Sequence, residues 1–341
     1  MPSGKFQSHP AAQSVEQALA SVESRLDKLH LPALEQKLGC SLDRLMRVAE
    51  AEAGAQWALR FSDQRQFLLS LAEDAARSEF GRFLLCTRGL NWRTTDLLFD
   101  PAHQAMLRRQ ERDHSLGLFD RLAFFSCPLF LATQERFHIF QQCTQPLVMD
   151  GTVLASLPCG RMRDLLSLDY AHIRQEVRLV GLDKDQEALQ AAQALAAEVQ
   201  AQKPLHGTVE FRASDGLRPG LTEAGIRREF DLVTSNGLNI YLNEDQCVTF
   251  YRHVHEALKP GGTFITSHIV PAEEYRWDQI NRDHWRLQTV ILTVLIGALW
   301  EPRVKPAQLV REQLERAGLR DVRILPDLQG IFPTFVARKP R

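Results

Sequence analysis

The chain has no excess of either charge. Its 341 residues include 41 lysines and arginines against 42 aspartates and glutamates, which leaves a formal net charge of −1. Proteins that bind nucleic acid usually carry a clear basic excess, and attraction to an anionic membrane surface needs one too. The balance therefore argues against nucleic acid and membranes as partners, and it favours a small molecule or a protein partner.

Long apolar runs and paired cysteines are also missing. The longest apolar run, Val290–Trp300, is too short to cross a hydrocarbon core of about 30 Å. The opening residues MPSGKFQSHPAAQS hold no apolar segment of the kind that a signal peptide needs. The six cysteines are scattered, with no C-x-x-C pair and no metal-ligand spacing. Together these absences predict a soluble cytoplasmic protein with reduced thiols and no metal site.

The first part of the chain has a helical pattern. After a polar stretch over residues 1–14, which we expect to be a mobile tail, apolar residues recur at intervals of three and four. The pattern predicts three helices before residue 80 and a later one that Pro128 interrupts. Residues 15–146 are therefore predicted to form a helical cap or lid domain.

After Pro146 the pattern becomes that of a parallel α/β sheet. Short β-type runs alternate with helical segments, of which residues 185–202 are the strongest helix formers. Such alternation indicates parallel strands joined by right-handed crossovers. The predicted strands are 152–156, 177–182, 208–212, 230–235, 262–268, 322–325 and 332–337. We therefore predict an α/β domain over residues 147–341, with an insertion at 273–304.

Residues suited to binding chemistry follow the ends of the predicted strands. The loop SLPCGRMRDLL (156–166) leads from the first strand into a helix, where backbone amides favour a ligand. Asp183 directly follows the second strand, and a carboxylate there can accept both hydroxyls of a ribose. Capping the next helix is its alternative role. Three more segments follow later strands: SDG at 214–216, SNGLNIY at 235–241, and LKPGG at 258–262 as a hairpin-like turn.

In this order the segments resemble the class I S-adenosylmethionine (SAM)-dependent methyltransferases. The resemblance covers about residues 150–341 and is carried by VLASLPCG, VGLDKD, ASDGL, FDLVTSNGLNIY, LKPGGTFITS and FPTFVARK. It implies a Rossmann-like sheet of seven strands in the order 3-2-1-4-5-7-6, with the last strand antiparallel. It also implies SAM as the cofactor, either as co-substrate or as sole substrate.

The resemblance further implies which residues surround SAM. The methionine half would contact the loop after the first strand, and the ribose would contact Asp183. The adenine would lie against the SDG segment, and the sulfonium would lie at the end of the fourth strand. Arg136 precedes the first strand, where an arginine can pair with the SAM carboxylate through two hydrogen bonds. A solvated helix surface is the alternative place for Arg136. The implied SAM-binding residues are Ser156, Pro158, Cys159, Gly160, Asp183, Lys184, Asp215, Gly216, Ser235, Asn236 and Arg136.

The methionine-binding loop departs from the family. Aligned on its CG dipeptide, this chain has Ser156 at the usual acid, Pro158 at the first glycine and Met162 at the third. The usual acid helps to hold the α-ammonium group of SAM, and serine adds no charge. Backbone carbonyls could take over that role without consequence. Alternatively, a neutral α-amino group attacks its own γ-carbon, which yields azetidine-2-carboxylate and methylthioadenosine; enzymes on similar folds catalyse this reaction.

Three side chains are candidates for orienting or deprotonating a nucleophile. Asn239 and Tyr241 alternate with apolar residues, so on an extended segment they share a face that would project toward the sulfonium. The Tyr241 hydroxyl could orient an amine or accept its proton through water, and packing on the adenosine is its alternative role. Tyr170 is a further aromatic residue on the cofactor side, with packing as its alternative role. The Asn/Asp-Pro-Pro-aromatic motif of enzymes that methylate base amino groups is absent after the fourth strand.

The sequence thus predicts a SAM-dependent enzyme that methylates a small molecule. SAM cyclisation is the alternative reaction, and a non-catalytic SAM-binding regulatory protein is the alternative role. The products separate the two reactions, because S-adenosylhomocysteine marks methyl transfer and methylthioadenosine marks cyclisation. The apolar run within the insertion is expected to be a buried helix or the contact of a homodimer.

Overall fold

The computed structural model divides the chain into two compact units, each formed by two stretches of sequence. One unit consists of residues 1–131 with 277–300, and the other of residues 132–276 with 301–341. Within them the structure describes residues 14–53, 63–203, 205–218, 226–299 and 302–341. In the described part of the chain, no helix combines the length and the apolar character that crossing a membrane would require.

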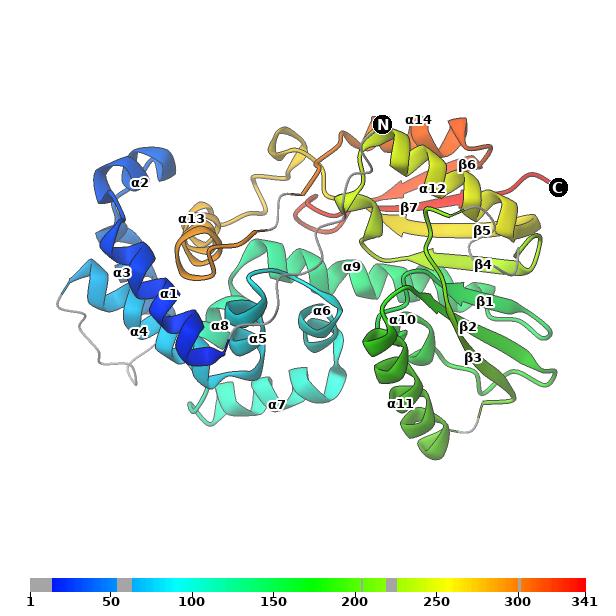
Figure 1. The fold of residues 1–341 in the computed structure, drawn as a ribbon, viewed down its shortest axis with the longest axis horizontal. Coiled ribbons are helices and arrows are strands. Elements are labelled where there is room, and N and C mark those ends of the chain that lie inside the picture. Colours follow the sequence, from blue (N-terminus) through cyan, green and yellow to red (C-terminus); the bar gives the residue numbers. More distant parts are fainter. Residues whose placement is uncertain (1–13, 54–62, 204, 219–225, 300–301) are drawn as a thin grey trace. The chain divides into compact units, whose positions relative to one another are not determined.

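The first unit is helical wherever the structure describes it (Figure 1). Its helices are α1 (Val15–Asp27), α2 (Leu31–Leu38), α3 (Leu42–Ala53), α4 (Gln64–Arg77), α5 (Glu79–Thr87), α6 (Trp92–Phe99), α7 (Pro101–Arg112) and α8 (Leu118–Phe125). Their starts are encoded locally, since Ser14 caps α1 and Asn91 caps α6, each through a capping box. Pro128 is the first residue of α9 (Pro128–Thr144), which continues into the second unit, so it separates two helices where one interrupted helix was predicted.

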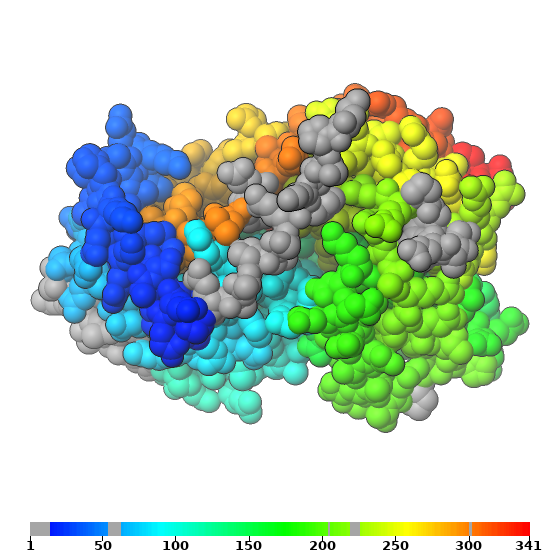
Figure 2. Space-filling view, in the orientation of Figure 1, coloured from blue at the N-terminus to red at the C-terminus, as the bar shows by residue number. Residues whose placement is uncertain are grey.

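A later segment completes the core of this unit. α13 (Arg282–Val290) and the π-helical turn η4 (Ile291–Leu295) contact α3 and α1 (Figure 1). Leu295 is buried among the apolar residues of the N-terminal helices, and the Arg25 guanidinium donates to the carbonyls of Val294 and Leu295. The orange atoms of the segment lie against the blue and cyan atoms of those helices (Figure 2). The apolar run is therefore helical and largely buried as far as Leu295, whereas Leu299 is exposed.

The second unit is built on one seven-stranded sheet (Figure 1). Its strands are β1 (Val153–Ser156), β2 (Val177–Asp183), β3 (Gly207–Ala213), β4 (Phe230–Ser235), β5 (Leu258–Ser267), β6 (Arg320–Leu325) and β7 (Thr334–Arg338). Their order is β3-β2-β1-β4-β5-β7-β6, and β7 runs antiparallel to both of its neighbours. The predicted fold class and strand order are confirmed. The predicted hairpin-like turn at LKPGG is wrong, because these residues lie inside β5, next to a shift in its register with β4.

Helices cover both faces of this sheet (Figure 1). One face carries α10 (Arg163–Leu166) and α11 (Gln186–Gln202), and the other carries α12 (Glu244–Ala257) and α14 (Ala307–Arg316). Short 3-10 turns lie at η1 (Gln145–Leu147), η2 (Leu238–Tyr241) and η3 (Ala272–Glu274). Because the inner strands are buried on both faces, they are apolar almost throughout, which made them recognisable from sequence. Polar side chains gather where these strands end.

Candidate functional site

The loop after β1 is fastened to neighbouring strands through its backbone. The Leu157 N–H donates to a carbonyl of β4 at 2.8 Å, and the Cys159 N–H donates to a carbonyl of β2 at 2.9 Å. The Gly160 N–H donates to the Asp183 carboxylate at 3.0 Å. The Leu157–Pro158 peptide is cis. The loop therefore lies over the C-terminal ends of β1, β2 and β4, the place where doubly wound sheets bind ligands.

The loop keeps a left-handed backbone at a position where the family has glycine. The φ angle is 49° at Gly160 and 58° at Met162, in a region that side chains other than glycine rarely adopt. Met162 is fully buried, and its sulfur lies 3.2 Å from the point where a Cβ of Gly181 would be. Met162 thus fills space above β2, and this packing offsets the cost of its backbone conformation.

Asp183 ends β2 with its carboxylate turned toward the loop. It accepts the N–H of Gly160 and that of Asp185, each at 3.0 Å, and burial raises the pKa of this carboxyl above its ordinary value. The helix-capping role belongs to Asp185, which accepts the Glu187 N–H at the start of α11. Each oxygen of Asp183 keeps a further lone pair for a ligand. Lys184, the next residue, is exposed.

The segment after β3 is held against α12. Asp215 is half-buried and accepts the N–H of Leu217 at 3.0 Å, which closes an Asx turn. The Gly216 carbonyl lies 3.0 Å from Nδ1 of His253, and a Cβ on Gly216 would lie 2.9 Å from the Phe250 ring. Gly216 is therefore a position where only glycine fits. His253, a residue of α12, fixes this turn.

The chain after β4 does not extend as predicted. Gly237 has φ 101°, and the next residues form the 3-10 turn η2. Asn239 is fully buried and donates from Nδ2 to the Tyr251 hydroxyl at 2.9 Å, whereas Tyr241 is 41% exposed. The expected common face of Asn239 and Tyr241 is therefore wrong, because a 3-10 turn spreads its side chains around an axis where a strand alternates them.

Tyr170 lies on the α10 side of the site with its hydroxyl engaged. That hydroxyl donates to the Leu165 carbonyl at 2.9 Å. Burial raises the pKa of Tyr170, and the nearby Asp164 carboxylate acts in the same direction. The side chain is half-buried, so its contacts favour a role in fixing α10.

Arg136 is a buried cation on α9. It is 4% exposed, its guanidinium stacks on the Phe332 ring with 4.6 Å between Cζ and the ring centroid, and Nη1 lies 4.0 Å from the Cβ position of Gly237. It forms no hydrogen bond or ion pair with any residue that the structure describes. Burial lowers its pKa to about 10, although Tyr241 and Asp327 favour the charged form. A solvated helix surface is thus the wrong place for Arg136.

Ser156, at the position of the family's acid, has a carboxylate as its neighbour. Its hydroxyl donates to the two oxygens of Asp164, at 2.9 and 3.1 Å. Alignment of the loop with the family pattern shows only the serine at the acid's position and does not indicate Asp164, eight residues further on.

His268, directly after β5, was also missed. Its Nε2 lies 3.0 Å from the Arg303 carbonyl, so Nε2 carries the proton, and the buried Nδ1 has no partner among the described residues. Burial together with Lys305 lowers the pKa of His268 to about 3. The imidazole is therefore neutral at physiological pH, with an unshared lone pair on Nδ1.

Several buried polar atoms at these strand ends lack partners among the described residues. They are Oγ of Ser214, Ser235 and Ser267, Oδ1 of Asn236, Nδ1 of His268 and, on α9, Nε of Arg136. We call the ends of β1 to β5, the polar residues that follow them and Arg136 the ligand edge. Buried polar groups are rarely left unsatisfied in folded proteins. A polar ligand with donors and acceptors of its own would satisfy this edge.

Comparison with protein families matches residues 150–310 to a family described as a methyltransferase domain. The match spans β1 to β5 and every predicted site residue except Arg136. A search of curated proteins found no significant match.

Solved structures resemble the chain at different levels. A protein from Bordetella parapertussis described as a possible exported protein is 34% identical, with a TM-score of 0.69 over 88% of this chain and 96% of that one. A SAM-dependent methyltransferase from Methanosarcina mazei is 14% identical, with a TM-score of 0.40 over 56% of this chain and 93% of that one. Human N-acetylserotonin methyltransferase is also 14% identical, with a TM-score of 0.39 over 80% of this chain and 71% of that one.

The strand order, the position of the loop after β1 and the family match agree with one another. A sheet of this order with an antiparallel β7, matched over its first five strands to a methyltransferase domain, is the fold that the sequence motifs implied. The chain therefore contains a class I SAM-dependent methyltransferase domain and is a SAM-dependent transferase.

Proposed function

We propose that the protein transfers the methyl group of SAM to a small-molecule acceptor. The observation that carries the proposal is the charge pattern of the ligand edge. Asp183 is a buried carboxylate with only backbone donors, and Arg136 is a buried guanidinium without an ion pair among the described residues. Buried charges of this kind are costly unless a partner arrives. SAM offers a ribose diol to the first and a carboxylate to the second.

The remaining residues fit SAM in the order that the motifs imply. Asp183 has acceptor capacity for the ribose hydroxyls and is followed by the exposed Lys184. Asp215 offers an acceptor oxygen to the adenine, next to the tightly packed Gly216. Ser156, Pro158, Cys159 and Gly160 line the methionine half. When bound, SAM supplies an electrophilic methyl group, and the protein contributes mainly by aligning the acceptor with it.

The acceptor would lie beyond β4. Ser235 and Asn236 present buried oxygens there that have no partner among the described residues, and Tyr241 is exposed enough to contact an acceptor. Asn239 would act by positioning η2, since its amide is bonded to Tyr251. Tyr170 would act by positioning α10. The balanced charge of the chain favours a small acceptor over a nucleic acid.

Cyclisation of SAM requires a neutral α-amino group as the nucleophile. The case for it depended on the absence of a carboxylate near that group. Asp164 next to Ser156 supplies a carboxylate, which favours the protonated, non-nucleophilic form. This supports methyl transfer over cyclisation.

Methyl-labelled SAM tests the proposal directly. The protein is incubated with labelled SAM alone, with a low-molecular-mass metabolite extract, and with added protein or nucleic acid, and the products are analysed by mass spectrometry. We expect S-adenosylhomocysteine and a labelled small molecule only when the extract is present. Azetidine-2-carboxylate from SAM alone would contradict methyl transfer. Label appearing only in added protein or nucleic acid would contradict the small-molecule acceptor.

A further inference from the structure

We propose that Asp164, acting through Ser156, supplies the negative charge that holds the α-ammonium group of SAM. The inference rests on the proposed function, because it describes how the methionine half of SAM is held. It replaces the expectation that the altered loop has lost this charge.

Asp164 stands directly behind Ser156 at the end of β1. The Ser156 hydroxyl donates to both of its oxygens, and the Thr234 hydroxyl of β4 donates to Oδ2 at 2.5 Å. Asp164 belongs to α10, which follows the loop, so its carboxylate lies where β1, β4 and the loop meet. The carboxylate that the family has on the strand is therefore replaced by one on the helix, which is hydrogen-bonded to the residue at the family's position.

The carboxylate of Asp164 is buried without a cation. Asp164 is 7% exposed and forms no ion pair with a described residue. The titratable groups around it are Cys159 and Tyr170, both kept neutral because burial raises their pKa, and the acidic Asp183 beyond Cys159. Burial also raises the pKa of Asp164 itself. A buried carboxylate that has only hydroxyl and backbone donors gains more from a cationic ligand than a solvated one would.

Ser156 transmits this charge toward the loop. A hydroxyl has one proton to donate, and Ser156 gives it to Asp164. Its lone pairs therefore face away from the carboxylate, where they can accept an N–H from the ligand. The adjacent negative charge strengthens that bond, because hydrogen bonds in series polarise one another. Asp164 is thus a positioning residue that acts through Ser156.

Calorimetric titration with two ligands separates an ammonium contact from a general loss of structure. S-adenosylhomocysteine carries the α-ammonium group, whereas methylthioadenosine shares its adenosine and thioether but lacks the amino acid. Asp164→Asn is expected to raise the Kd of S-adenosylhomocysteine about tenfold or more, and to change that of methylthioadenosine by less than about twofold. Ser156→Ala is expected to act in the same direction by a smaller factor.

The double variant Ser156→Asp/Asp164→Asn returns the charge to the strand. It is expected to recover most of the affinity for S-adenosylhomocysteine, which a merely structural role of Asp164 would not predict. Equal weakening of both ligands by Asp164→Asn, or no weakening of either, overturns the proposal. If that variant does not fold, equal effects of Ser156→Ala on both ligands overturn it. Failure of the unaltered protein to bind S-adenosylhomocysteine would overturn the proposed function together with this inference.

Discussion

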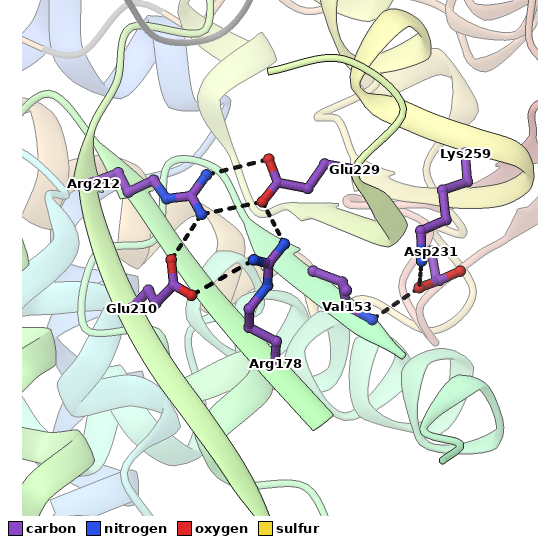
Figure 3. A network of polar contacts seen from close by, with 7 residues as sticks. All are labelled: Val153, Arg178, Glu210, Arg212, Glu229, Asp231 and Lys259. Carbon is purple, nitrogen blue, oxygen red and sulfur yellow. Dashed lines mark hydrogen bonds and ion pairs between the residues drawn. The ribbon is translucent and has the colours of Figure 1, made fainter. Parts of the chain in front are cut away.

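The ligand edge contrasts with the charged groups elsewhere on the same sheet. At the starts of β1, β2, β4 and β5, and along β3, charged side chains pair with one another (Figure 3). Asp231 accepts the Val153 N–H at 2.8 Å and the Lys259 ammonium at 2.6 Å. Glu229 and Glu210 both pair with Arg178 and Arg212. We call these residues the paired network.

The difference shows which part of the fold is complete without a ligand. In the paired network each carboxylate has at least one cation from another strand of the sheet, and the side chains are partly exposed. At the ligand edge, Asp183 and Arg136 are more deeply buried, and neither has an ion pair among the described residues. Pairing stabilises the sheet, whereas unpaired buried charge favours the bound state. Substitutions in the two regions should therefore have opposite effects on stability and on binding.

The largest expected effect is on binding, from Asp183→Ala. It removes the acceptor of the Gly160 N–H and the group proposed to hold the ribose. We expect the Kd of S-adenosylhomocysteine to rise at least about a hundredfold, because two hydrogen bonds to a buried charged acceptor are lost. Calorimetric titration measures it, with Asp231→Asn in the paired network as the control of unchanged affinity. Near-normal affinity of the Asp183→Ala variant for S-adenosylhomocysteine would contradict the assignment of Asp183 to the ribose.

Arg136→Met should separate binding from stability. The affinity for S-adenosylhomocysteine is expected to fall about tenfold or more, since a two-pronged pair with the carboxylate is lost. The free energy of unfolding without ligand should stay the same or rise by about 1 kcal/mol, because methionine removes a buried charge that lacks an ion pair. Chemical denaturation in the absence of ligand checks the second part. A clear loss of stability would mean that Arg136 serves the fold.

Glu229→Gln should lower the stability of the fold without weakening ligand binding. It weakens the pairs with Arg178 and Arg212, which are partly exposed, so we expect a loss of about 1 kcal/mol in the free energy of unfolding. The Kd of S-adenosylhomocysteine should not change. A tenfold change in Kd would show that the paired network and the ligand edge are energetically coupled.

The sequence predicted the parts of this fold that local pattern determines. The strands β1, β2 and β4 are largely apolar runs at the expected spacing, and Asp183 is the last residue of β2. Which residue caps α11 became clear only from the structure, in which Asp185 accepts the Glu187 N–H.

Contacts between residues that are distant in the sequence could not be predicted from local sequence patterns. Arg136 stacks on Phe332, almost two hundred positions away, and no periodicity in either segment indicates the pairing. The left-handed Gly237 redirects the chain into η2, so alternation after β4 gave the wrong faces for Asn239 and Tyr241. Asp164 is only eight residues from Ser156 in the sequence. Alignment position by position still did not reveal it, because its carboxylate reaches the end of β1 from a helix.

The smallest expected effect is on the pH dependence of stability, and it concerns the carboxylates of the ligand edge. Burial raises the pKa of Asp164 and Asp183 in the folded, unliganded protein above the ordinary 3.8. The folded state then binds these protons more tightly than the unfolded state, so their contribution to stability is present below about pH 3.8 and is lost as the pH rises through the folded pKa values. Ligand binding requires the ionised carboxylates, so affinity should increase over the same range.

Asp164→Asn isolates this effect from other carboxylates. Relative to the unaltered protein, its melting temperature without ligand should rise as the pH increases above about 4, because only the unaltered protein must bury a charge there. Thermal unfolding at a series of pH values measures the difference. A difference that stays constant or falls as the pH rises would mean that Asp164 already has a charge partner within the fold, and its proposed role in holding the ammonium would lose its basis.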